Sequence, residues 1–187
     1  GESTAVLAGD ALLTAAFETL ANSGAGADII AGTVKTLAVA AGELGMVGGQ
    51  VLDLAAEEEE TPDAEHIYTL QDLKTGALIR AACEMGCILA DRDDLRAAAR
   101  AYAHGVGMAF QICDDLLDIE STTEQLGKPT GSDAANQKST YVSLLGLEGA
   151  RAAAESYTAQ AVQAAAALGT SGAPLATLAE LLFRRKK

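Results

Sequence analysis

Apolar residues recur every three to four positions along almost the whole chain, the spacing that places them on one face of an α-helix. The stretch 4–21 shows the pattern clearly, because its leucines and its phenylalanine fall in one stripe. Clusters rich in glycine, serine, asparagine or proline interrupt the pattern and mark helix ends. The pattern predicts helices over residues 4–21, 28–59 with an interruption around 45–49, 64–90, 95–119 and 139–168, and a short last helix after a turn at 169–174.

The segment 121–138 has loop character, and no stretch alternates convincingly as a strand. We therefore predict an all-α fold in a single domain that covers residues 1–187. Composition agrees with this prediction, because 49% of the residues are hydrophobic but only 4% are aromatic. Such a chain suits closely packed helices better than a β-sandwich.

The acidic balance of the chain limits its partners. It has 13 Lys+Arg against 26 Asp+Glu, a formal charge of −13, which disfavours binding to nucleic acid. An anionic substrate would need a local basic cluster or bridging metal ions. No apolar run reaches ~18 residues and no leader sequence opens the chain, so we expect a cytoplasmic protein without stable membrane insertion. The basic end 184–187 is expected to be solvated or to complement the dipole of a helix.

Cysteine and histidine give weak functional signals. Cys83 and Cys87 share one helical face, but no histidine or further cysteine nearby completes a metal site, so we expect small buried hydrophobic residues there. His104 is expected to pack or to cap a helix rather than to catalyse.

The stretch 110–118, Phe-Gln-Ile-Cys-Asp-Asp-Leu-Leu-Asp, carries the strongest chemical signal. On a helix its apolar residues form one broad arc, whereas an amide and three carboxylates converge on the other side. These four polar residues are Gln111, Asp114, Asp115 and Asp118. Like charges at this spacing destabilise a helix unless cations are supplied, and Mg²⁺ prefers carboxylate oxygens together with water and phosphate.

Taken alone, such an acidic cluster is usually a solvated face. Other polar residues of the chain change this interpretation. Lys74 and Thr75 lie upstream of the cluster, and Lys128 and Lys138 lie in or beside the predicted loop. Cations, a hydroxyl, an amide and carboxylates in one all-α chain indicate a diphosphate held by lysines and Mg²⁺.

A second polar group follows Gly48-Gly49. Gln50 and Asp53 lie three residues apart and therefore share a helical face. Spacing alone favours a glycine-packed helix contact with exposed acidic residues, and the alternative is a polar lining of a cavity.

Motifs in order along nearly the whole chain resemble those of the trans-polyprenyl diphosphate synthases, especially the bacterial short-chain farnesyl diphosphate synthases. The matching segments are Gly9-Asp10-Ala11-Leu12-Leu13, Gly48-Gly49-Gln50-Val51-Leu52-Asp53-Leu54, Lys74-Thr75-Gly76-Ala77-Leu78-Ile79, the stretch 110–118 as a second Asp-rich motif, Leu126-Gly127-Lys128-Pro129 with Gly131-Ser132-Asp133, and Lys138-Ser139-Thr140-Tyr141. The resemblance implies the isoprenoid-synthase helical bundle around a central cavity, normally as a homodimer. It also implies Mg²⁺-dependent condensation of isopentenyl diphosphate with an allylic diphosphate, dimethylallyl or geranyl, to farnesyl diphosphate.

The resemblance also implies roles for individual residues. Asp114 would be the principal Mg²⁺ ligand, with Asp115 and Asp118 as direct or water-mediated partners. Lys74, Lys128 and Lys138 would contact the allylic diphosphate, while Thr75 and Gln111 would lie by the reacting carbons. Gln50 and Asp53 would line the cavity.

The family's first Asp-rich motif precedes the segment 9–13 and is absent here, so the chain resembles the C-terminal two-thirds of such an enzyme and lacks the N-terminal helices. We expect it to be inactive alone. Three alternatives stay open: a geranylgeranyl diphosphate synthase, a class I terpene cyclase, and a non-catalytic subunit of a heteromeric synthase. A cyclase would be expected to carry N-D-x-x-S-x-x-x-E where this chain has D-D-x-x-D.

Overall fold

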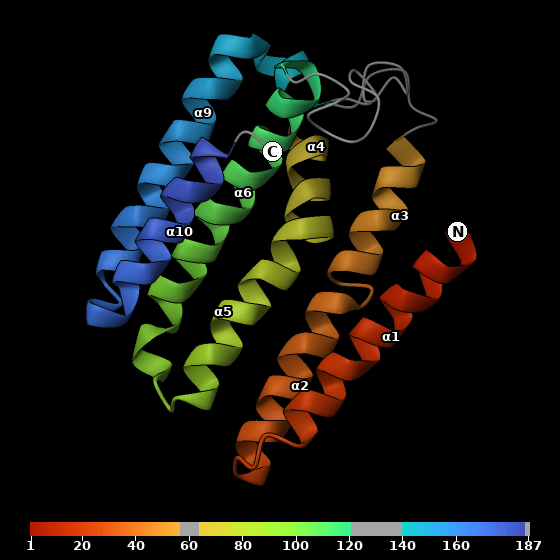
Figure 1. Ribbon diagram of the computed structural model, residues 1–187, viewed down its shortest axis with the longest axis vertical. Coiled ribbons are helices and arrows are strands. Elements are labelled where there is room, and N and C mark those ends of the chain that lie inside the picture. Colours follow the sequence, from red (N-terminus) through yellow and green to blue (C-terminus); the bar gives the residue numbers. More distant parts are fainter. Residues whose placement is uncertain (57–63, 121–139, 186–187) are drawn as a thin grey trace.

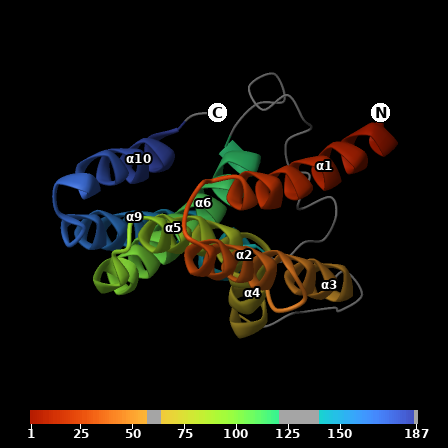
Figure 2. The ribbon, with the colours of Figure 1, turned by 90° about the horizontal axis from the view of Figure 1, so that it is seen from below.

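The computed structural model describes residues 1–56, 64–120 and 140–185, and every regular element in these ranges is helical, as predicted. The α-helices are α1 (Glu2–Ala21), α2 (Ala27–Ala41), α3 (Met46–Ala56), α4 (Ala64–Gln71), α5 (Ala77–Leu89), α6 (Arg96–Glu120), α9 (Tyr141–Ala166) and α10 (Gly172–Arg184). Short helical turns join some of them: η1 (Asp72–Gly76), η2 (Asp93–Leu95) and η3 (Gly169–Ser171). The helices run along the long axis of the molecule (Figure 1). Seen from below, α9, α5 and α2 form a row, with α10 and α1 on the same side of it (Figure 2).

The main core lies between α6 and α9. Ile112 on α6 and Ala150 and Ala154 on α9 are completely buried there. Small residues allow the two backbones to approach closely, and a Cβ on Gly105 would lie 2.7 Å from the carbonyl oxygen of Tyr157. The alanine-rich sequence of α9 is therefore a packing requirement of the contact with α6.

Helix α10 is tied to this core by a hydrogen bond. The buried hydroxyl of Tyr102 on α6 donates to the carbonyl oxygen of Leu175 at 2.9 Å. Burial raises the pKa of Tyr102 to about 12, so the hydroxyl remains a donor throughout the neutral range.

Two predicted helices are interrupted in ways that periodicity only partly indicates. The predicted helix 28–59 breaks at residues 42–45, slightly before the expected position. Gly45 is suited to this break, because a Cβ there would lie 2.9 Å from the Cα of Ala40. The predicted helix 64–90 contains the π-helical turn η1, which widens the helix without ending it.

The helix after the predicted loop begins where its capping residues lie. The hydroxyl of Thr140 accepts from the backbone N–H of Ser143, and the Ser143 hydroxyl accepts in turn from the Thr140 backbone, which forms a capping box. The predicted loop 121–138 and the acidic run 57–60 lie outside the described residues.

Helix α1 buries none of its residues. Leu7 and Leu12 are 67% and 73% exposed, although the periodicity places them on an apolar stripe. Two stretches, Glu2–Ala21 and Ala27–Ala56, are long and apolar enough to cross a membrane by length and composition, a test that core helices of soluble proteins also pass.

The cysteines are free thiols, and the burial predicted for Cys83 and Cys87 is only partial. Cys113 is buried, whereas Cys83 and Cys87 are only half-buried. Burial raises the pKa of all three, so they are protonated at neutral pH and poor nucleophiles.

Candidate functional site

The π-helical turn η1 presents Lys74 and Thr75 between α4 and α5. Both side chains are half-buried. π-Helical turns are rare and often occur at functional sites, because they rotate side chains out of the regular helical register. The turn packs against both α3 and α6, and a Cβ on Gly107 of α6 would lie 3.6 Å from the Cα of Gly76. The polar residues singled out on α3, η1 and α6 are thus carried by elements in direct contact.

Helix α3 approaches the turn through a glycine. A Cβ on Gly49 would lie 2.6 Å from the Cα of Lys74, so a larger residue would push the two backbones apart. One turn later, the carboxylate of Asp53 pairs with the Lys74 ammonium, with Nζ and Oδ2 2.5 Å apart. Gln50, which is exposed, donates weakly to the same oxygen at 3.4 Å.

These contacts combine the two interpretations of the segment 48–54. The glycine-packed contact is confirmed, but the prediction of an exposed acid at Asp53 is wrong, since its side chain is only 17% exposed. Gly49 allows α3 to approach Lys74 closely, and Asp53 pairs with the Lys74 ammonium, so both residues help to hold Lys74 in place.

The Asp-rich end of α6 does not keep its carboxylates on one exposed face. Asp114 is exposed, whereas Asp115 and Asp118 are buried, the latter to 2% exposure. The Oδ2 of Asp115 accepts from the backbone N–H of Tyr141 at 2.8 Å, at the first turn of α9. A carboxylate is favoured at this place by the positive end of the helix dipole. A fully solvated acidic face is therefore not what the structure shows, because Asp115 and Asp118 are buried and Asp115 contacts the start of α9.

The opposite arc of α6 follows the prediction closely. Leu117 is half-buried, and the other members of the predicted apolar arc are buried: Tyr102, Val106, Ala109, Cys113 and Leu116. Gln111 lies half-buried at the edge between the two arcs.

A cation from the C-terminal end reaches the Asp-rich motif. Arg185 forms an ion pair with Asp114, donates to the carbonyl oxygen of Phe110 at 3.3 Å, and lies 4.0 Å from the centre of the Phe110 ring. Arg185 thus has a specific contact that the expectation of a solvated or dipole-complementing end does not include. The contact joins residues 71 positions apart, so no local pattern reveals it; the only signal is the opposite charge of the two segments. Lys186 and Lys187 lie outside the described residues.

The described residues contain no group of three or more carboxylate, histidine or cysteine side chains arranged to hold a metal ion. Proteins usually hold Mg²⁺ by one or two carboxylates completed by water and substrate phosphates. Asp114 and Asp118, one helical turn apart, could supply such a pair, and Arg185 would have to release Asp114 for an ion to bind there. The donor set therefore fits Mg²⁺ bound together with a phosphate group. Lys128 and Lys138 lie outside the described residues.

His104 packs beside the site, as expected. It lies between Tyr68 and Tyr157, edge-on to both, with ring centroids 6.1 and 5.8 Å apart. Its Nδ1 is 3.8 Å from the carboxylate of Asp72, the first residue of η1. The His104 ring thus packs between α4, α6 and α9, beside the first residue of the π-helical turn.

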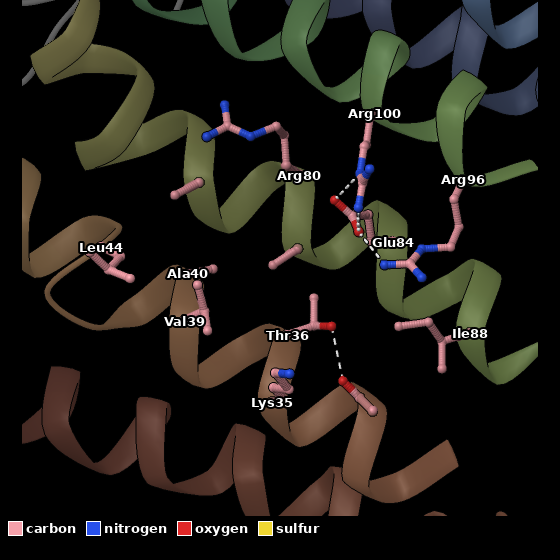
Figure 3. A pocket seen from close by; sticks show the side chains of 13 residues that line it. Lys35, Thr36, Val39, Ala40, Leu44, Arg80, Glu84, Ile88, Arg96 and Arg100 are labelled. Atoms are coloured by element: carbon pink, nitrogen blue, oxygen red, sulfur yellow. Dashed lines mark hydrogen bonds and ion pairs between the residues drawn. The ribbon is translucent and has the colours of Figure 1, made fainter. Parts of the chain in front are cut away.

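A separate cavity of about 540 Å³ lies lower in the molecule, between α2, α5 and the start of α6. Glu84 holds two arginines there: Arg96 donates to it at 2.8 Å and Arg100 at 2.6 and 2.8 Å (Figure 3). This ion cluster ties α5 to α6 and includes none of the predicted site residues.

A model of the family "Polyprenyl synthetase" matches residues 1–170. The chain is 44% identical over 151 residues to a farnesyl diphosphate synthase of Micrococcus luteus, which covers 80% of this chain and 52% of that protein. It is 39% identical over 189 residues to a geranylgeranyl diphosphate synthase of Cyanophora paradoxa, which covers 99% of this chain and 63% of that protein.

Solved structures give the same result for the fold. A geranyltransferase from Helicobacter pylori, complexed with magnesium and isoprenyl diphosphate, matches with a TM-score of 0.80 and 34% identity over 97% of this chain and 59% of that chain. An FPP/GFPP synthase from Zymomonas mobilis matches with a TM-score of 0.79 and 38% identity over 96% of this chain and 61% of that chain. The isoprenoid-synthase bundle is confirmed, and the chain spans about half to two-thirds of the length of these relatives.

Proposed function

The chain belongs to the polyprenyl synthetase family, and from this premise we propose that it carries the diphosphate-binding part of a trans-prenyltransferase. The proposed reaction joins isopentenyl diphosphate to dimethylallyl or geranyl diphosphate and yields farnesyl diphosphate. One observation carries the proposal: α3 and α6 both pack directly against η1, and each of the three elements carries polar residues of the predicted site. Residues 1–187 act as a single domain in this proposal.

Lysines and carboxylates would share the work of binding. Lys74, held in place by Asp53, contacts the allylic diphosphate, and Lys128 and Lys138 add two further cations. Thr75 and Gln111 orient the substrate near the reacting carbons, while Gln50 lines the cavity next to Asp53.

The family uses a divalent metal, and we propose Mg²⁺ for this chain. When bound, Mg²⁺ would neutralise the diphosphate and stabilise the charge that develops on it as it leaves. Asp114 and Asp118 would hold the ion. Asp115 would support them by fixing the start of α9, since it accepts the N–H of Tyr141.

The exposed leucines of α1 indicate that another protein surface packs against this helix. Leu7 and Leu12 lie far more exposed than the periodic pattern of the helix would place them. We propose that a second copy of the chain, in a homodimer, or the additional length that the relatives possess covers this stripe. A cytoplasmic location is part of the proposal, although one relative, a geranylgeranyl pyrophosphate synthase of Capsicum annuum, is chloroplastic.

Calorimetric titration with inorganic pyrophosphate tests the binding part of the proposal on the 187-residue chain. We expect binding that requires Mg²⁺ and that weakens about tenfold or more in Asp114→Ala, the loss of one metal-bridged charge contact. Asp94→Ala is the matched control, because Asp94 is an exposed carboxylate paired with Arg92. Equal binding by Asp114→Ala and by the unchanged chain would contradict the proposal, as would binding that is unaffected by a chelator.

Product analysis tests the reaction and its alternatives. With Mg²⁺, isopentenyl diphosphate and geranyl diphosphate, we expect little or no product from this chain alone and farnesyl diphosphate from the chain extended by the N-terminal segment of a relative. Geranylgeranyl diphosphate as the main product would favour the alternative synthase. Turnover of farnesyl diphosphate alone to a cyclised hydrocarbon would favour a terpene cyclase. An inactive extended chain that binds a second, active synthase would favour a non-catalytic subunit.

A further inference from the structure

Arg80 on α5 contacts both the side chain and the backbone of Asp72, the first residue of the π-helical turn. Its guanidinium forms an ion pair with the carboxylate of Asp72 and donates to the backbone carbonyl oxygen of Asp72 at 3.3 Å. The two residues are eight positions apart, a rise of about 12 Å in a regular α-helix, so the arginine must extend back along the turn to reach Asp72. It thus spans the whole of η1.

Arg80 is distinct from the ion cluster lower on the same helix. Arg96 and Arg100 both point toward Glu84, whereas Arg80 points away from it (Figure 3). Arg80 therefore pairs with the π-helical turn and not with Glu84. A guanidinium suits this contact, because its rigid fork can donate to a carboxylate and a carbonyl oxygen together.

Gly76 provides the space for this arrangement. A Cβ at this position would lie 2.9 Å from the Nη1 of Arg80 and 3.2 Å from the Oδ1 of Asp72. A side chain as small as that of alanine would therefore require the end of Arg80 to shift.

The other side of the same turn carries the site. Lys74 packs against Gly49 and pairs with Asp53, so a change in the pitch of η1 would move the Lys74 ammonium away from Asp53. We propose that Arg80 is a positioning residue, which fixes η1 in its π-helical form and thereby holds Lys74 toward Asp53. The link from this geometry to diphosphate binding rests on the proposed function.

Acylation of lysines under native conditions, measured by mass spectrometry, tests the geometric part. In Arg80→Gln we expect Lys74 to react roughly fivefold faster relative to the exposed Lys35, the ratio that corresponds to about 1 kcal/mol. Arg80→Lys should give an intermediate rate, since a lysine can keep the ion pair but lacks the fork. The control Arg100→Gln removes an arginine from the Glu84 cluster and should leave the ratio unchanged.

Gly76→Ala provides a second route to the same result, because it displaces Arg80 without removing it. Its effect on Lys74 should have the same direction as that of Arg80→Gln without exceeding it, and the double variant should show no further increase over Arg80→Gln. Unchanged Lys74 reactivity in both single variants would overturn the proposal, as would an equal increase in Arg100→Gln.

Mg²⁺-dependent pyrophosphate titration of the same variants tests the link to function. We expect Arg80→Gln to weaken binding severalfold and Arg100→Gln to leave it unchanged. If the unchanged chain does not bind pyrophosphate, the proposed function fails while the acylation result still decides the role of Arg80. Faster acylation of Lys74 with unaltered pyrophosphate affinity would overturn the positioning role in binding.

Discussion

Apolar side chains are buried on one side of the molecule and exposed on the other. On one side, α6, α9 and α10 bury their apolar stripes against one another, and Ile112, Ala150 and Ala154 are completely buried. On the other side, the leucine-containing helix α1 buries none of its residues. Periodicity therefore predicts where a helix can bury a face, but burial itself depends on whether another surface is present.

Truncating one apolar residue on each side tests this contrast most strongly. Ile112→Ala leaves a cavity in the α6–α9 core and should lower the free energy of unfolding by about 3–4 kcal/mol. Leu12→Ala removes a side chain that is 73% exposed and should change it by less than about 0.5 kcal/mol. Urea denaturation of both variants measures the difference.

A large loss of stability in Leu12→Ala would break the comparison, because it would show that α1 is already packed in the isolated chain. Such a loss only at high protein concentration would instead indicate that a second copy covers the stripe.

Two glycines test the contact that builds the site. Gly49→Ala forces a Cβ to within 2.6 Å of the Cα of Lys74, so we expect a loss of about 2–3 kcal/mol in the free energy of unfolding. Gly32→Ala is the matched control in the neighbouring helix α2, because the added Cβ meets only a side-chain methyl of Ile88 at 3.6 Å. The control should be neutral or stabilising by up to about 1 kcal/mol, the gain in helix propensity. Equal effects of the two substitutions would contradict the close contact between α3 and η1.

Most of the fold could be predicted from the sequence, because helix formation and helix ends depend on local signals. The stretches 4–21 and 95–119 differ from α1 and α6 by only a few residues, and the all-α class follows directly. The π-helical turn η1 could not be predicted, because one wider turn leaves the apolar periodicity of the flanking helices nearly unchanged.

The candidate site could be predicted in its parts but not in its contacts. The sequence places Lys74, Asp53 and Asp114 in polar motifs, and the structure adds the partner of each. Those partners are distant in sequence: Lys74 and Asp53 are 21 positions apart, and Asp114 and Arg185 are 71 apart. Such pairs depend on how the helices pack, and helical periodicity carries no information on that packing.

Asp115 provides a third test, within the tightly packed side of the molecule. Asp115→Ala leaves the buried N–H of Tyr141 without its acceptor, and we expect the free energy of unfolding to fall by about 2 kcal/mol. Asp115→Asn keeps an acceptor oxygen but loses the favourable interaction of a negative charge with the α9 N-terminus, so its loss should be about half as large. Urea denaturation distinguishes the two, and equal losses in both variants would show that the charge, rather than the hydrogen bond, carries the effect.

The smallest expected effect lies where the two sides join, at the Glu84 cluster between α5 and α6. The hydrogen bond from Arg100 lowers the pKa of Glu84 below its usual value of 4.5; burial opposes this shift, and the hydrogen bond from Arg96 adds to it. Because the pKa is lower in the folded than in the unfolded chain, the stabilisation is present above about pH 5 and is lost as pH falls through the folded-state pKa. Glu84→Gln should therefore lower the free energy of unfolding by about 1 kcal/mol at pH 7 and by much less near pH 3. Urea denaturation at both pH values measures this, and a difference between the two proteins that does not depend on pH would mean that packing, not charge, joins α5 to α6.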